Sequence, residues 1–304
     1  MANLAYTTLD VFTSVRFEGN PLAVITDAEG LDAGMMQKIA AEFGYSEITF
    51  VLPPSDPANT AHVRIFTPTM EVPFAGHPNV GTAYFIGQQR EVFGKPVSDR
   101  LRFEEAAGIV EVDLRRSNGQ VTAATIRAPK PLQTGANIPE ADIARCIAIR
   151  PDQIATALHR PLFVSVGLEF AVAELDSLDA LAAAAPNPAL FREAAGNRSE
   201  NNHDFSLFLY VRSKENPWHL RARMFAPLDN VAEDPATGSA SAALAAYLVS
   251  RTTGDGEQRV TIEQGVEMGR RSIIEVDVTK AGGTVTDVLI SGSCVFVMRG
   301  EILA

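Results

Sequence analysis

The sequence predicts an α+β protein built as two similar lobes. Three observations lead to this fold class: an internal duplication, short stretches of strand-like alternation, and two alanine- or glycine-rich segments that are expected to be central helices. The chain has 304 residues, of which 46% are hydrophobic and 21% charged. This is enough apolar material for one large core or two smaller ones.

The duplication is the strongest of these observations. Residues 109–126 match residues 273–290 with eight identities in eighteen positions, at an offset of 164. Upstream, Phe66 of one copy aligns with Phe225 of the other at an offset of 159, and residues 19–24 resemble residues 167–172 at 148. The offset rises along the chain, as expected if the second copy carries insertions. Two copies of a long mixed unit indicate a duplicated domain and not a solenoid.

The elements follow the same order in both copies. An early helix is expected at Leu31–Glu42, and its counterpart begins in residues 178–185. Strands are expected at residues 48–52, 110–114, 205–211 and 273–278. We therefore divide the chain into an N-terminal lobe, residues 1–128, and a C-terminal lobe, residues 129–304, with a Pro- and Gly-containing linker at 129–135. A variant of this division returns the last strand, about 290–304, to the N-terminal lobe.

Composition excludes several classes of function. The formal net charge of -11 disfavours nucleic acid as a partner and gives no long-range attraction for an anionic substrate. No run of about eighteen uncharged apolar residues exists and the N-terminus lacks a basic leader, so we expect no membrane association and a cytoplasmic location. Cys146 and Cys294 stand far apart without His or Cys partners, which argues against a disulfide framework or a metal site.

Two helix starts are the first candidate site. The offset of 159 aligns residues 74–83 with residues 233–242, which pairs Ala75 with Asp234 and His77 with Ala236. Helix N-termini carry about half a positive charge and free N–H groups, so they bind carboxylates without net basic charge. If the lobes face each other across a pseudo-twofold axis, both helix starts point into a shared cleft.

Glu47 is the second candidate, because the duplication is broken there. It stands at the head of an apolar strand, and its counterpart is Ser206. Burial raises the pKa of a carboxyl group toward the range that a general acid or base needs. The bland alternatives remain open for each candidate: Glu47 as an exposed strand end, His77 as a capping or core imidazole, and Asp234 and Ser239 as helix caps.

Five motifs in chain order resemble the phenazine-biosynthesis PhzF family. They are Phe17–Val24, Ser46–Phe50, Arg64–Pro68, Phe74–Pro78 and Glu233–Ser239. The resemblance runs from about residue 5 to about residue 300. It implies the diaminopimelate epimerase-like fold, in which each of two pseudo-symmetric lobes is a curved sheet or barrel around a central helix. It also implies an active site between the lobes, a homodimer, and no cofactor or metal.

The resemblance also implies roles for individual residues. Related epimerases and racemases exchange a proton between two cysteines, but the corresponding positions here hold Ala75 and Asp234, which excludes a two-thiol mechanism. The resemblance assigns proton transfer to Glu47, with His77 and Asp234 assisting. Residues expected to bind substrate are Asn20, Ser46, Gly76, Gly238 and Ser239, and the last three donate to the substrate's carboxylate.

The function predicted from these observations is isomerisation of a small carboxylate-bearing metabolite by a proton moved between two of its carbons. The best named substrate is trans-2,3-dihydro-3-hydroxyanthranilate, the type substrate of the family. Two alternatives remain open at this stage. One is a carboxylate-binding protein without chemistry, and the other is an epimerase that uses Glu47 as one base and Asp234 or His77 as the other.

Overall fold

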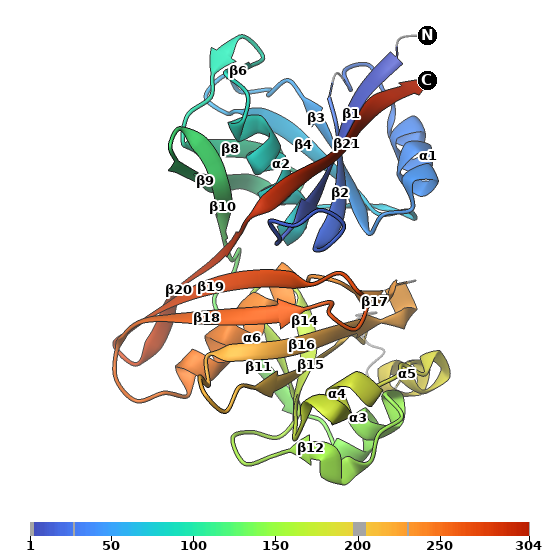
Figure 1. Cartoon of the computed structure of the whole chain (residues 1–304), viewed down its shortest axis with the longest axis vertical. Coiled ribbons are helices and arrows are strands. Elements are labelled where there is room, and N and C mark those ends of the chain that lie inside the picture. The colour runs from blue at the N-terminus through green and yellow to red at the C-terminus, as the bar shows by residue number, and fades with distance from the viewer. Residues whose placement is uncertain (1–2, 27, 197–204, 230, 304) are drawn as a thin grey trace. The chain divides into compact units, whose positions relative to one another are not determined.

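The computed structural model describes residues 3–26, 28–196, 205–229 and 231–303. The chain forms two compact units (Figure 1). Unit 1 consists of Met1–Arg127 with Ser291–Ala304, and unit 2 consists of Ala128–Ile290. Among the described residues, no helix combines the length and the apolar character needed to cross a membrane.

Unit 1 is a sheet that packs around one central helix, α2, with a second helix, α1, beside it. Its elements are β1 (Asn3–Val11), β2 (Asn20–Ile25), α1 (Ala33–Phe43), β3 (Glu47–Leu52), β4 (Ala61–Phe66), β5 (Glu71–Val72), α2 (Gly76–Gly87), β6 (Glu91–Val92), β7 (Lys95–Pro96), β8 (Arg100–Glu105), β9 (Gly108–Ser117), β10 (Gln120–Arg127) and β21 (Cys294–Leu303). Strand β1 pairs antiparallel with β2 and β21, and β2 pairs in parallel with β3. The sheet continues through β4, which pairs with β3, β5 and β8, and then through β9 and β10.

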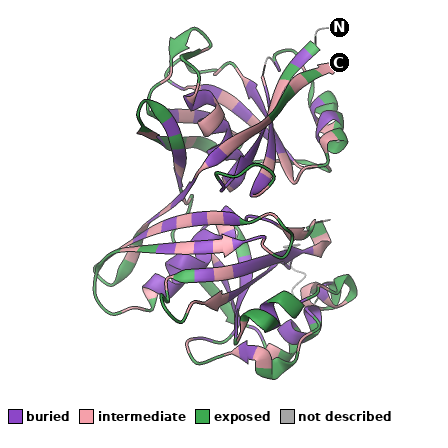
Figure 2. Ribbon diagram, in the orientation of Figure 1, coloured by how far each residue is buried: buried purple, intermediate pink, exposed green. Residues whose placement is uncertain are grey.

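Helix α2 is the central element of unit 1. It packs against β1, β2, β3, β9 and β10, and nine of its residues are buried. Such a helix is apolar on every side because every side meets the sheet. Glycines permit the close approach: a Cβ at Gly81 would lie 2.4 Å from Leu22 Cδ2. Figure 2 shows the buried residues concentrated in this helix and the strands around it.

Unit 2 repeats this plan with additional helices. Its elements are β11 (Gln133–Asn137), α3 (Glu140–Cys146), the 3-10 turn η1 (Pro151–Gln153), β12 (Ile154–Ala155), β13 (Leu162–Ser165), β14 (Glu169–Leu175), α4 (Leu178–Ala183), α5 (Pro188–Gly196), β15 (Leu207–Arg212), β16 (His219–Ala226), η2 (Pro227–Asp229), β17 (Val231–Asp234), α6 (Gly238–Ser250), β18 (Gly256–Gln264), β19 (Ser272–Ala281) and β20 (Thr284–Gly292). The linker expected at residues 129–135 is shorter than predicted, since β11 begins at Gln133.

The strand pairings confirm the two-lobed α+β fold and the duplication. The parallel pair β2–β3 has its counterpart in β14–β15, and the parallel pair β4–β8 in β16–β18. Ile48 lies opposite Phe66, and Leu207 lies opposite Phe225, which reproduces the offset of 159 in both strands. Helix α6 corresponds to α2, and most of its residues are buried against β13, β14, β18 and β19.

The register predicted for the helix starts is wrong by three residues. Helix α2 begins after its N-cap Ala75, whereas α6 begins after its N-cap Thr237. By position in the fold, Thr237 is therefore the counterpart of Ala75, and Asp234 ends the preceding strand β17. The three additional residues enter between β16 and β17: Ile65 pairs with Val72 and Met224 with Asp234, so β16 keeps the offset of 159 whereas β17 already has 162.

Candidate functional site

Glu47 is the first residue of β3, where the strand leaves the loop after α1. Its backbone lies opposite Leu22 in the parallel pairing with β2. The side chain is 22% exposed, and its Oε2 lies 3.7 Å from Nδ1 of His77. The expected juxtaposition of these two side chains is therefore present inside unit 1. A carboxylate that is mostly but not fully buried can both meet a ligand and exchange protons with it.

His77 is the second residue of α2 and is only 5% exposed. Burial lowers the pKa of this imidazole to about 3, so the ring is neutral near pH 7. Its contact with Glu47 is consequently a carboxylate beside a neutral imidazole, not an ion pair. Nε2 of His77 is buried, and no described residue forms a hydrogen bond with it. A buried polar atom of this kind needs an explanation, and a bound ligand is one.

The N-terminus of α2 adds hydrogen-bond donors beside His77. Its N-cap, Ala75, has an extended backbone and forms no side-chain capping bond. Gly76 and His77 thus begin the helix with backbone N–H groups that the first turn does not use, whereas Pro78 has none to offer. The Asn79 side chain donates through Nδ2 to the Ala75 carbonyl at 3.1 Å and fixes this turn. A helix end of this type suits an anionic group.

Two polar pairs hold the strand that carries Glu47. Ser46, just before it, donates from Oγ to Oδ1 of Asn20 at 3.0 Å, and Asn20 is buried at the start of β2. Two residues after Glu47, the hydroxyls of Thr49 and Thr82 lie 2.8 Å apart and connect β3 to α2. Asn20, Ser46 and Glu47 are therefore grouped at the start of β2 and β3.

Unit 2 holds the other predicted site residues at the start of α6. The Thr237 hydroxyl donates to Oδ2 of Asp234 at 2.5 Å. Gly238 and Ser239 are the first two residues of the helix, the former buried and the latter half-buried. Thr237, the N-cap, forms no side-chain capping bond with the helix, because its hydroxyl is directed to Asp234. Asp234, Gly238 and Ser239 are thus close in the chain and at one helix end.

Sequence reasoning missed the residue that organises this segment, Gln264. This fully buried side chain at the end of β18 accepts from Thr237 N at 3.0 Å. It also donates to the Asp234 carbonyl at 2.7 Å and to the Thr237 hydroxyl at 3.0 Å. A signal for it exists in the sequence: Val260, Ile262 and Gln264 occupy the buried phase of the strand alternation. A polar residue in that phase must have polar partners.

Neither cysteine fits a catalytic thiol. Cys146 is buried in α3, where burial raises its pKa to about 11, and Cys294 is buried at the start of β21, where burial raises its pKa still further. Both are therefore protonated thiols near pH 7, and the thiolate is the reactive form. Within the described ranges, no group of three or more His, Cys, Asp or Glu side chains is arranged to hold a metal ion.

Comparison with known proteins places this geometry in a family. The model of the PhzC-PhzF family, described as phenazine biosynthesis-like protein, matches residues 9–300. The chain belongs to the PhzC-PhzF family. A relative in Mesorhizobium japonicum, named an uncharacterized isomerase, is 38% identical over 98% of each chain. The trans-2,3-dihydro-3-hydroxyanthranilate isomerase of Pseudomonas fluorescens is 36% identical over 98% of this chain and 99% of its own.

Solved structures agree with this assignment. A PhzF family protein of Bacillus anthracis superposes with a TM-score of 0.86 at 26% identity, covering all of both chains. A hydroxyproline epimerase of Agrobacterium vitis, at 12% identity, shares the fold with a TM-score of 0.67 over 99% of this chain and 92% of its own. The diaminopimelate epimerase-like fold expected from the sequence is confirmed. For activity, the comparisons support the coarse class, an isomerase of the PhzC-PhzF family.

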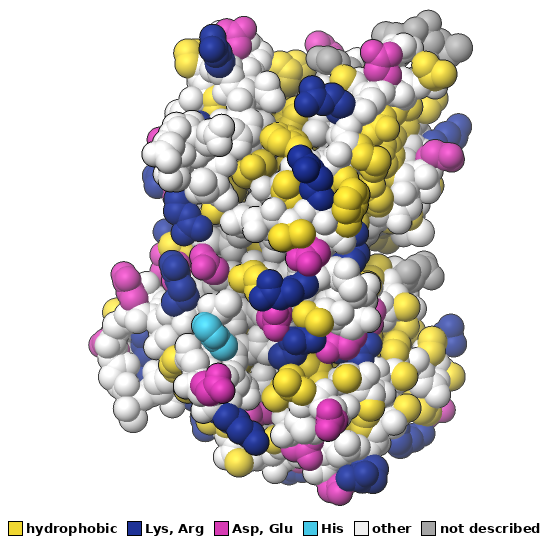
Figure 3. Space-filling view, in the orientation of Figure 1, with side chains coloured by type: hydrophobic (Ala, Val, Ile, Leu, Met, Phe, Trp, Pro, Cys, Tyr) yellow, Lys and Arg dark blue, Asp and Glu magenta, His cyan; other side chains and the backbone are white. Residues whose placement is uncertain are grey.

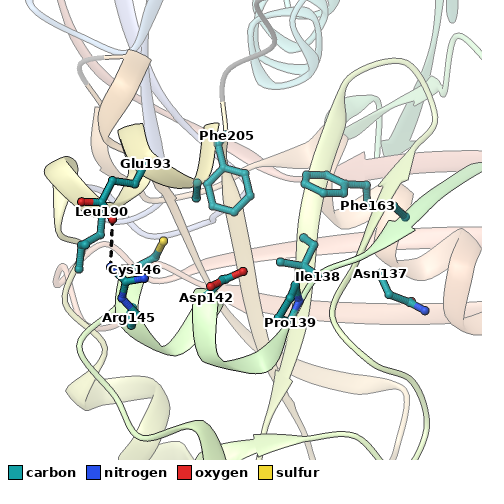
Figure 4. Close-up of a pocket in the computed structure, with 12 residues that line it drawn as sticks. Asn137, Ile138, Pro139, Asp142, Arg145, Cys146, Phe163, Leu190, Glu193 and Phe205 are labelled. Carbon is teal, nitrogen blue, oxygen red and sulfur yellow. Dashed lines mark hydrogen bonds and ion pairs between the residues drawn. The ribbon is translucent and has the colours of Figure 1, made fainter. Parts of the chain in front are cut away.

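A separate cavity of about 310 Å³ opens in unit 2, among α3, α5, β11 and β13 (Figure 4). Phe163 and Phe205 form part of its apolar wall, and the ion pair of Arg145 with Glu193, at 3.0 Å, stands at its edge. None of the predicted site residues lines it. For this member of the PhzC-PhzF family, the cavity therefore lies apart from the residues expected to carry the chemistry.

Proposed function

We propose that this chain is a cofactor-independent isomerase that moves a proton between two carbons of a small carboxylate-bearing metabolite, with Glu47 as the proton carrier. The observation that carries the proposal is the placement of Glu47 beside a buried, neutral His77 at the uncapped start of α2. This arrangement combines a base, a second polar group that is uncharged near neutral pH, and donors for an anion.

The proton balance of the step is simple. The Glu47 carboxylate takes a proton from one carbon, and the electron pair of the broken C–H bond moves into the adjoining π system. The same carboxyl then returns the proton to a second carbon, a C–H bond forms there, and the double bond shifts. No oxidant or reductant is consumed. General acid–base catalysis of this kind contributes about 10²–10⁴-fold in rate.

Neutral His77 suits this chemistry better than a charged one. An imidazolium at 3.7 Å would stabilise the Glu47 carboxylate and weaken it as a base. The neutral ring has one N–H donor and one acceptor nitrogen, so it can assist the proton transfer or hold a polar group of the substrate. Nε2, buried and without a hydrogen bond from the described residues, is the atom we assign to the substrate.

The substrate class follows from the helix end and from the relatives. Free backbone N–H groups at the start of α2 favour a carboxylate. The relative in Pseudomonas fluorescens is named for isomerising trans-2,3-dihydro-3-hydroxyanthranilate, which carries a carboxylate. We propose the same compound as the first substrate to test. Asp234, Gly238 and Ser239 are proposed to contact substrate polar groups from the α6 helix start, and a homodimer in the cytoplasm remains our prediction.

The deciding experiment compares the wild type with Glu47→Gln in deuterated water, using trans-2,3-dihydro-3-hydroxyanthranilate. Glutamine keeps the shape but removes the basic carboxylate, so we expect turnover to fall by about 10²-fold or more. Binding of anthranilate, a ring carboxylate that cannot isomerise in this way, should change little in calorimetry. Glu42→Gln, an exposed glutamate on α1, is the control and should behave as wild type.

The same experiment distinguishes the alternatives. Undiminished turnover in Glu47→Gln would remove Glu47 as the proton carrier. The wild type is also incubated with a panel of cyclic and acyclic amino acids in deuterated water. If it binds anthranilate saturably but turns over no substrate, and no deuterium enters any of these amino acids, the chain is a binding protein. Deuterium entering at an inverted stereocentre, without a shifted double bond, would indicate an epimerase. Mass and chirality of the products report all of these results.

A further inference from the structure

A second carboxyl group, that of Glu105, lies near Asn79 in the first turn of the same helix. Glu105 is the last residue of β8, and it lies opposite Gly108 across the turn into β9. Within this turn, the backbone N–H of Ala107 donates to the Pro73 carbonyl at 3.1 Å. The turn therefore rests on the segment that leads into α2. This contact places a carboxyl group next to the first turn of the helix without any role in the chemistry proposed above.

The carboxyl of Glu105 is buried in an unusual way. Both of its oxygens are buried, and no described residue forms a hydrogen bond with either; the same is true of Oδ1 of Asn79. Burial raises the pKa of Glu105 to about 8, and the nearby Asn79 side chain lowers it in part. Its neighbour Glu104 shows the opposite environment, since it accepts from Asn59 and from two backbone N–H groups that hold its pKa at about 2.

Two buried acceptors close to each other can be satisfied by one additional proton. A protonated carboxyl has an O–H donor, whereas a carboxylate and an amide oxygen both only accept. Asn79 donates one N–H of Nδ2 to the Ala75 carbonyl, and no described residue donates to its Oδ1. A buried donor or acceptor left unsatisfied destabilises the folded state, so a proton shared between the two groups is favoured.

We propose that Glu105 is a neutral carboxylic acid at physiological pH, that it donates its proton to Asn79 Oδ1, and that it thereby spares the α2 helix start a second negative charge beside that of Glu47, which would weaken binding of an anionic substrate. The proposal rests on the proposed function in assigning a carboxylate to that helix start. Glu105 acts through Asn79 and the first turn of α2, so it is a positioning residue and not a catalytic one.

Ionisation of Glu105 would reverse this effect. A full negative charge next to Asn79, in the first turn of a helix whose end carries about half a positive charge, would repel the substrate carboxylate. The charged groups on the surrounding elements do not compensate for it, and Glu47 on β3 already places a carboxyl oxygen 3.7 Å from Nδ1 of His77 at this helix start. Glu71 on β5 is paired with Arg64, Glu111 on β9 is paired with Arg102, and His77 on α2 is neutral. The affinity for an anion is consequently expected to fall once Glu105 loses its proton.

Infrared spectroscopy of the wild type tests the protonation state directly. The C=O stretching band of a protonated carboxylic acid should persist at pH 7 and disappear with a midpoint about 8, and it should be missing in Glu105→Gln. Anthranilate affinity of the wild type should fall by roughly tenfold in total between pH 7 and pH 9, while Glu105→Gln should keep its pH 7 affinity up to about pH 9. The control Glu91→Gln, an exposed glutamate on β6, should follow the wild type in both measurements.

Each result decides one question. A wild type without a protonated carboxyl band at pH 7 overturns the proposal, and it does so even if Glu105→Gln does not fold. If the band titrates as expected but anthranilate affinity has the same pH dependence in wild type and Glu105→Gln, Glu105 is protonated but does not influence anion binding at the α2 helix start, and that part of the proposal is wrong. Complete lack of anthranilate binding by the wild type contradicts the proposed function instead, since the infrared titration is read without ligand.

Discussion

Burial determines the charge of His77, and this charge connects the site to the stability of the protein. The ring is almost completely enclosed on α2, and its pKa is lowered to about 3. In the unfolded chain an imidazole titrates near 6.5. The folded state therefore binds a proton less readily than the unfolded state. The stability associated with this neutral ring is fully present above about pH 6.5 and is lost as the pH falls toward 3.

Replacing His77 by asparagine should remove this pH dependence. Asn keeps a polar side chain but cannot be protonated. Between pH 6.5 and pH 4, the free energy of unfolding of the wild type should fall relative to that of His77→Asn by about 1.4 kcal/mol per pH unit. Urea unfolding of both proteins at several pH values measures this difference, in which acid effects common to the two cancel.

His219→Asn is the matched control, because His219 is exposed on β16. Its unfolding free energy should follow the wild type across the same pH range. A difference between wild type and His77→Asn that stays constant from pH 7.5 to pH 4 would contradict a neutral, buried His77.

Some residues of the candidate site could be predicted from the sequence and others could not. Glu47 was recognisable because a charged residue at the head of an apolar strand breaks the duplication, and its partnership with His77 was implied by the resemblance to the PhzF family; the two side chains lie 3.7 Å apart. Gln264 and Glu105 were not predicted. Their roles depend on contacts between segments far apart in the sequence, with Asp234 and Thr237 for one and with the α2 start for the other. A local pattern does not specify such contacts.

At the scale of the element, close packing of α2 positions His77 against the strand of Glu47. Gly81 lies one turn after His77, and a Cβ there would come within 2.4 Å of Leu22 Cδ2 and 2.8 Å of Val11 Cγ2. Both neighbours are fully buried, so neither has free space to retreat into. Leu22 is also the residue opposite Glu47 in the β2–β3 pairing. The helix cannot move at Gly81 without disturbing the strand that carries the carboxylate.

Gly81→Ala should therefore destabilise the protein and reduce turnover. Overpacking costs about 1–3 kcal/mol, and the better helix propensity of alanine returns only about 1 kcal/mol. Urea unfolding and kcat measure the two effects. Gly196→Ala, at the exposed end of α5 where an added Cβ would meet nothing within 4 Å, is the control and should be neutral or stabilising. Equal stability and turnover in both variants would show that α2 has room at Gly81.

Element types were more predictable than their register. Alternation placed β3, β9, β15 and β19 correctly, and the helix expected at Leu31–Glu42 is α1, which begins after Asp32 caps Met35 N and ends at Gly44. The three residues inserted before α6 escaped prediction. Sequence identities are too few in this segment to reveal them. The structure shows that the ion pair of Arg64 with Glu71 recurs as Arg223 with Glu233, with an offset of 159 for the arginines and 162 for the glutamates. That repeated pair identifies where the two copies diverge.

At the scale of the whole molecule, the net charge of -11 opposes the approach of the proposed substrate. On the face shown in Figure 3, Lys and Arg side chains are interspersed with Asp and Glu and form no basic patch. Attraction for a carboxylate must therefore come from short-range donors such as those at the α2 helix start. The long-range field and the local site act in opposite directions on an anion.

These opposite directions predict a characteristic salt dependence. The screening length falls from about 30 Å at 0.01 M ionic strength to about 8 Å at 0.15 M, which removes long-range repulsion but leaves contacts within the site almost intact. The kcat/KM for an anionic substrate should therefore rise, roughly two- to fivefold, over this range, while kcat stays constant. If screening is the cause, steady-state kinetics should show the same dependence of kcat/KM on ionic strength in chloride and in fluoride salts. A kcat/KM that falls with salt in both series would mean that the substrate meets an attractive field, contrary to the charge of the chain.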